Sequence, residues 1–228
     1  MPKLPFPRLF ACLAAAAAGI STYWLALRPW HQRWGASEGE LNRPLPGDEL
    51  VPAPKSLATH AVTVDAPAAA VWPWLVQMGC QRAGWYSYDR LDNGGVPSAD
   101  RVLPEFQSLA VGDVILATPD GSAGFPVLAL EPGRYLILGG YVDPFSGRTT
   151  ADGPQSDAYF KVSWLFYLDE VARDTTRLIT RFRVDHAPAW LGVATYGLLE
   201  PLSFVMERKM LLNLKRRVEE HARRTVDV

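Results

Sequence analysis

Two neighbouring stretches decide the fold, YFKVSWLFYLDE (159–170) and TRLITRFRVDH (176–186). In each, every second position is mostly apolar, as in a strand that rests one face on a core. In the second stretch, the positions that alternate with the apolar ones include three arginines, Arg177, Arg181 and Arg183. This pattern predicts two long antiparallel strands in a hairpin, with an apolar face to be covered and the arginines on a solvated face.

A helix near the C-terminus, predicted over 201–223, is the natural cover for that apolar face. At about 100° per residue, five apolar side chains share one arc of this helix. They are Phe204, Met210, Leu211, Leu214 and Val218. Glu207 lies in the middle of the same arc, so the pattern places a carboxylate on the face that should be buried.

A carboxylate on a buried face has to be paired, protonated or directed at a polar cavity. We expect Glu207 to line a cavity, with His186, on the inward set of the last strand, as its partner. The alternative is a local tilt of the helix that turns Glu207 to solvent or pairs it with Arg208 or Lys209.

The residues before the two long strands complete an α+β pattern. We predict a strand over 59–64, a helix over 65–78, an irregular insert over 82–110 and further strands within 111–142. The expected architecture is a curved antiparallel sheet wrapped around one long C-terminal helix, with an N-terminal transmembrane helix in addition.

Three parts of the chain resemble the helix-grip proteins of the SRPBCC superfamily, which includes START domains, the birch pollen allergen family and polyketide cyclases. They are VTVDAPAAAVWPWLVQMG (62–79), TRLITRFRV (176–184) and the helix over 201–223. GWYSYDRLDN (84–93) resembles an uncharacterised bacterial subgroup with an N-terminal membrane segment. The resemblance implies a ligand cavity between sheet and helix. It implies no shared catalytic motif, because superfamily members bind lipids, sterols, hormones or polyketides and only some are enzymes.

Aromatic side chains with polar tips suit the mouth of such a cavity. With inward residues of the strands and the helix, they give the predicted ligand-binding set: Trp85, Tyr86, Tyr88, Trp164, Phe182, His186, Glu207 and Met210. If the protein is an enzyme, Glu207, His186 and Tyr88 are the acid or base candidates. The sequence contains no nucleophile motif, metal-ligand spacing or cofactor motif, so we predict no metal and no cofactor.

The N-terminal run LFACLAAAAAGISTYWLAL (9–27) has no charged residue, and as a helix it would span about 28 Å, close to a bilayer core. We predict a single-pass anchor in the lipid bilayer within residues 1–34, with a cleaved signal peptide as the alternative. Residues 35–56 hold four prolines and predict a linker to a ligand-binding domain over 57–228.

The charge is nearly balanced, with 24 acidic and 23 basic residues, so we expect no nucleic-acid partner. An apolar cavity beside an anchor predicts a membrane-anchored binding protein for a hydrophobic or amphipathic small molecule, such as a lipid or isoprenoid. Two alternatives stay open: a cyclase, dehydratase or hydrolase that uses the same cavity, and a stress-related or partner-binding module.

Overall fold

The structure, a computed structural model, describes residues 6–226 of the chain. Its strands form one antiparallel seven-stranded sheet in the order β1-β7-β6-β4-β3-β2, with β5 paired to β4. In chain order they are β1 (Ser56–Val64), β2 (Val114–Leu116), β3 (Gly124–Glu131), β4 (Tyr135–Val142), β5 (Thr149–Thr150), β6 (Tyr159–Ala172) and β7 (Thr175–Ala187). The predicted α+β class with an antiparallel sheet is confirmed.

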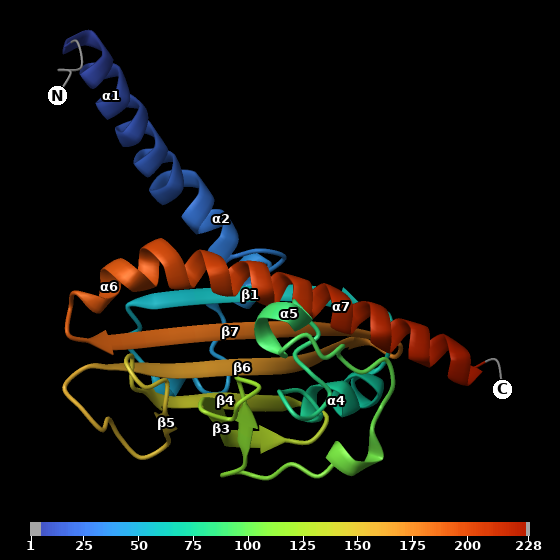
Figure 1. Cartoon of the computed structure of the whole chain (residues 1–228). Helices are drawn as coiled ribbons and strands as arrows, with labels where there is room; N and C mark the ends of the chain where they lie inside the picture. The colour runs from blue at the N-terminus through green and yellow to red at the C-terminus, as the bar shows by residue number, and fades with distance from the viewer. Residues whose placement is uncertain (1–5, 227–228) are drawn as a thin grey trace.

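Helices accompany this sheet, and α1 projects away from it (Figure 1). In chain order they are α1 (Phe6–Thr22), η1 (Tyr23–Leu27), α2 (Arg28–Gln32), α3 (Glu38–Asn42), η2 (Asp48–Leu50), α4 (Ala68–Val76), α5 (Asp89–Asp92), η3 (Pro104–Phe106), α6 (Leu191–Ala194), η4 (Thr195–Leu199) and α7 (Glu200–Val226). The long helix α7 crosses one face of the sheet, and α4 and α5 lie beside it. The expected long C-terminal helix is therefore present and lies across the sheet.

The hairpin of β6 and β7 forms as the alternation predicts. Trp164 pairs with Phe182, and Phe166 pairs with Thr180, so the apolar set of both strands shares one face. We call this the inner face, because it packs on α7 and α4. Its core joins strand residues to helix residues, including Val64, Phe166, Leu178, Trp74, Leu211 and Leu214.

The opposite, outer face of the sheet is also covered. Residues 35–53, here called the outer belt, contain α3 and η2 and bury Leu45 against Ile137, Leu165 and Ile179 of the sheet. A segment rich in proline that has no apolar periodicity nevertheless docks on the sheet. The predicted division into anchor, linker and domain stays a prediction, but the structure seats most of the 35–56 segment on this face.

The three arginines of β7 hold the outer belt. Arg177 makes two parallel 2.8 Å hydrogen bonds to the carboxylate of Glu40. Arg181 donates to Asp48 at 2.8 Å and to the backbone oxygen of Glu40 at 2.6 Å, and Arg183 donates to Asp48 at 3.0 Å. The prediction of a solvated arginine face is therefore wrong, since the side chain of Arg181 is only 3% exposed. The predicted alternation of side chains along β7 is correct, but the outer belt, and not water, accepts hydrogen bonds from these arginines.

The predicted membrane anchor over 9–27 is also wrong. None of the helices within residues 6–226 combines the length and the apolar character that crossing a bilayer requires. The helix α1 ends at Thr22, and the rest of the run forms the wider turn η1, which folds onto the domain. There the Tyr23 hydroxyl donates to the backbone oxygen of Tyr196, and the Trp24 ring packs edge-on against the Tyr196 ring at 5.9 Å. Residues 1–5 of the predicted anchor segment lie outside the described residues.

Arg181→Ala tests the role of the outer belt. The substitution removes one of the two arginines that pair with Asp48 and the donor of three backbone oxygens, and removing one partner of a buried ion pair typically costs about 3–5 kcal/mol. We therefore expect the free energy of unfolding, measured by urea titration, to fall by about that amount. Arg134→Ala, which breaks an exposed pair with Glu131, is the control and should leave the unfolding midpoint unchanged. Equal effects of the two variants would contradict a stabilising role of the contacts between Arg181 and the belt.

Candidate functional site

Glu207 lies on the face of α7 that meets the sheet, and only 7% of the residue is exposed. Its carboxylate has two partners from two strands. His60 of β1 lies with Nδ1 3.0 Å from Oε2, and the indole Nε1 of Trp164 on β6 donates to Oε1 at 3.1 Å. The predicted burial of Glu207 is confirmed, and the predicted partner His186 is wrong.

The proton on His60 can be placed from its second contact. Nε2 lies 2.8 Å from the backbone oxygen of His31, and a carbonyl oxygen can only accept, so Nε2 carries a hydrogen. Nδ1 then either donates to a Glu207 carboxylate as part of an imidazolium or accepts from a protonated Glu207. Burial alone would lower the pKa of His60 and raise that of Glu207. Their mutual attraction outweighs burial in both, which raises the pKa of His60 and lowers that of Glu207. Both directions favour the ionised form of the pair.

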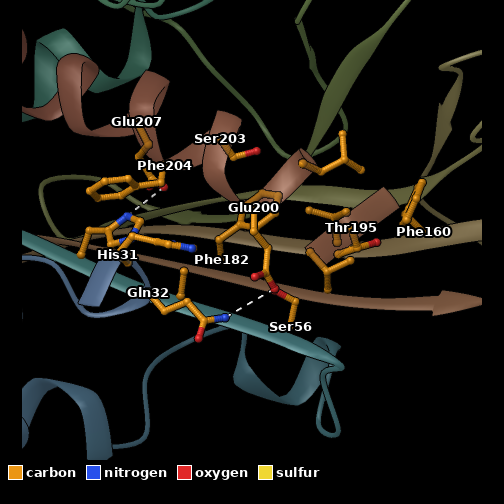
Figure 2. A pocket seen from close by; sticks show the side chains of 15 residues that line it. His31, Gln32, Ser56, Phe160, Phe182, Thr195, Glu200, Ser203, Phe204 and Glu207 are labelled. Atoms are coloured by element: carbon orange, nitrogen blue, oxygen red, sulfur yellow. Dashed lines mark hydrogen bonds and ion pairs between the residues drawn. The ribbon is translucent and has the colours of Figure 1, made fainter. Parts of the chain in front are cut away.

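A first cavity of about 140 Å³ lies between α7, β1, the N-terminal part of β6 and the C-terminal part of β7. Figure 2 shows Glu207, Phe204 and His31 at one end of it and Thr195 and Phe160 at the other. Seven of the fifteen residues that line it are apolar: Ala58, Phe160, Val162, Phe182, Val184, Leu199 and Phe204. The polar groups along it are largely occupied, because Glu200 already accepts from Arg28, Gln32 and Ser56.

A second cavity of about 200 Å³ lies on the other side of Glu207. Its aromatic and sulfur-containing wall consists of Trp85, Phe125, Trp164, Phe182, Met206 and Met210. The indoles of Trp85 and Trp164 stack at 5.6 Å with an interplanar angle of 17°. Ser87, Asp92, Ser203 and Glu207 are its polar residues. Phe182, Ser203 and Glu207 line both cavities, so the two adjoin at the buried ion pair.

Part of the predicted ligand-binding set lines these cavities. Its members there are Trp85, Trp164, Phe182, Glu207 and Met210. These residues come from the insert, from β6 and β7, and from α7. The structure thus brings together residues that lie more than a hundred positions apart in the sequence.

Tyr86, Tyr88 and His186 lie elsewhere. The Tyr86 hydroxyl accepts from Gln77 and donates to the backbone oxygen of Trp74, and burial raises its pKa, so this side chain is a core residue. Tyr88 lies under Lys209, whose Nζ is 3.8 Å from the ring centroid, in a groove outside the cavities. His186 is buried against Phe160 and Tyr196, and within the described part of the chain neither of its ring nitrogens has a hydrogen-bond partner.

The sequence reasoning missed His60, His31 and Asp92. A signal for His60 existed, because it precedes Val62 by two positions and so shares its face of the strand. No local pattern marks His31, since it reaches the cavity through the contacts of α2 with β1 and α7. Asp92 ends a short helix, α5, in the irregular insert, where no periodicity predicts the direction of a side chain.

Comparison of the sequence with known protein families finds no match, and no characterised protein in the comparison is similar to it. Solved structures give weak likenesses. A hypothetical protein of Helicobacter pylori is 13% identical with a TM-score of 0.48, over 77% of this chain and 95% of its own. Two others reach a TM-score of 0.44: a Nitrosospira multiformis protein at 14% identity (74% of this chain, 99% of its own) and a Nitrosomonas europaea protein at 15% (73% and 96%). These likenesses are compatible with the sheet-and-helix architecture and carry no argument about function.

Glu207→Gln tests the ionised pair through its pH dependence. The pKa of His60 is raised in the folded protein. Its contribution to the free energy of unfolding is therefore fully present below pH 6.5, the usual pKa of histidine, and is lost as the pH rises through the raised pKa. The pKa of Glu207 is lowered in the folded protein. Its contribution to the free energy of unfolding is therefore fully present above pH 4.5, the usual pKa of glutamate, and is lost as the pH falls through the lowered pKa. We expect the stability advantage of the wild type over Glu207→Gln to be largest near about pH 5.5 and to shrink as the pH rises through the raised pKa of His60.

Urea titrations of both proteins at several pH values measure this difference. Burial lowers the pKa of His31 and the charge of His60 lowers it further, so the titration of His31 follows the charge of His60 and belongs to the same pH-dependent difference. A stability difference that is constant over the whole pH range would contradict an ionised His60–Glu207 pair.

Proposed function

We propose that this protein binds a hydrophobic or amphipathic small molecule between the sheet and α7. The observation that carries the proposal is the pair of adjoining cavities, whose walls are mostly apolar and meet at the carboxylate of Glu207. Ligand sites are typically concave and apolar, with a few fixed polar groups that orient the ligand. Here His60 and Trp164 fix the polar group, and Phe182 and Ser203 extend the shared wall.

The chemistry of the walls favours a lipid-like or isoprenoid-like ligand. Aromatic rings and two methionines surround the second cavity, and methionine adapts its shape to irregular apolar ligands. We further propose that the chain is a helix-grip protein related to the SRPBCC superfamily. The sheet with a long C-terminal helix across its inner face supports this relationship.

A cyclase, dehydratase or hydrolase is the less favoured function. Of the three predicted acid or base residues, only Glu207 lines the cavities. Both of its oxygens already accept hydrogen bonds from the protein, which suits an orienting group better than one that exchanges protons with a substrate. A partner-binding module would not need the two apolar cavities at all.

Mass spectrometry of small molecules extracted from the purified protein tests the proposal. Met210 lines the second cavity, so Met210→Trp fills space that a ligand would use. We expect an apolar compound in the wild-type extract and about a tenfold weaker signal in Met210→Trp, which corresponds to about 1.4 kcal/mol of binding. Leu202→Trp adds the same side chain at an exposed position of the same helix and should retain the compound.

The affinity for N-phenyl-1-naphthylamine, an uncharged apolar fluorophore, provides a second readout that does not depend on a ligand surviving purification. The wild type and Leu202→Trp should bind this probe, and Met210→Trp should bind it more weakly. Urea titrations verify that both variants are folded. A folded wild-type protein that yields no compound and binds no probe would contradict the proposed function.

A further inference from the structure

We infer that the second cavity holds a protonated aliphatic amine, with its positive charge beside Asp92 and against the indole rings of Trp85 and Trp164. The inference rests on the proposed function and deepens it, because it assigns the ligand a chemical class: an apolar molecule that carries an amine.

Asp92 is a buried carboxyl with an unused oxygen. The residue is 7% exposed and lines the second cavity. Its Oδ2 accepts from the backbone N–H of Tyr88 at 3.2 Å, whereas Oδ1 has no hydrogen-bond partner among residues 6–226. The Ser87 hydroxyl, which also lines the cavity, donates its single hydrogen to the backbone oxygen of Met206. While that hydrogen goes to Met206, no described residue donates to Oδ1, although the Ser87 hydroxyl lies close enough to Asp92 to donate to it instead.

The charge of Asp92 is likewise unbalanced. In the described structure Asp92 forms no ion pair, and the charged neighbour that acts on it is Asp89, which has the same sign. Burial is the main cause that raises the pKa of Asp92, as expected of a carboxyl that lacks a cationic partner. Burying an unpaired charge is unfavourable, so a cation at this position gains both an ion pair and a hydrogen bond.

The other carboxylate of the cavity does not compete for this cation. Glu207 is already balanced by His60 and receives a second hydrogen bond from Trp164. Asp92 is thus the carboxylate of the cavity that no described residue neutralises. This balance matches a ligand with a single positive charge.

The aromatic wall suits the same charge. Besides the stacked indoles of Trp85 and Trp164, the Phe125 ring stands edge-on to both, at 6.4 Å and 5.7 Å. The faces of aromatic rings attract cations, and tryptophan does so most strongly. Aromatic faces with one carboxylate therefore favour an ammonium group over a hydroxyl or a carboxylate of similar size.

Displacement of bound N-phenyl-1-naphthylamine tests the inference. Decylamine, 1-decanol and decanoate share a chain length and differ in the head group, and each is used below its micelle-forming concentration near neutral pH. We expect decylamine to displace the probe from the wild type at a concentration at least about tenfold lower than either of the others needs. Asp92→Asn keeps the size of the side chain and an acceptor for Tyr88 N–H. It should reduce the advantage of the amine to less than about threefold, with each displacement compared at the variant's own affinity for the probe.

Asp174→Asn, in the exposed turn between β6 and β7, removes the same charge from the surface and should keep the full preference for the amine. Equal displacement by decylamine and decanol, with the probe bound, would overturn the amine site and leave the proposed function intact. If the probe does not bind, calorimetric titration with decylamine decides. Binding that Asp92→Asn abolishes supports the amine site, and no binding overturns it.

Discussion

The buried ion pair of His60 and Glu207 constrains the rest of this structure. A carboxylate in the middle of the inner face of α7 forces the helix to lie where it can reach a cation and a second donor. His60 on β1 and Trp164 on β6 supply them from strands on either side of β7. The same imidazole holds the backbone of α2 through His31, so one pair fixes a strand, the long helix and the N-terminal segment. Such a pair contributes less net stability than its short distances suggest, and we interpret its role here as fixing the position of the helix.

Periodicity predicted the parts of the fold that repeat. The alternation in β6 and β7 and the arc of α7 gave the hairpin, the inner face and the burial of Glu207, because period-two and helical patterns report which side chains share a face. The partner of Glu207 could not be read in this way. It depends on strand order, and the neighbour of β7 that faces Glu207 is the distant strand β1. Trp85, Trp164, Phe182 and Met210 could be predicted as cavity residues from size and direction, whereas Tyr86 fits the same description and is a core residue.

The docking of the outer belt and the folded N-terminal run could not be predicted, for one physical reason. Composition describes a segment in isolation, and both segments are shaped by contacts with residues far along the chain. The prolines and acidic residues of the outer belt resemble a linker until Arg177 and Arg181 are placed opposite Glu40 and Asp48. The apolar N-terminal run has the composition of a membrane span, but its second part is wound into η1 by a contact with Tyr196, which is 173 residues away from Tyr23.

These long-range contacts set an order of events for a chain that is made from one end. Three side chains of the N-terminal part are synthesised long before their partners. Glu40 pairs with Arg177, His60 with Glu207 and Arg28 with Glu200, across separations of 137, 147 and 172 residues. A fold dominated by contacts of this kind forms slowly, because long loops lose conformational entropy before the contacts stabilise the fold. The outer belt and β1 therefore leave the ribosome without partners, and the acidic side chains and prolines of the belt keep it solvated until β7 is complete.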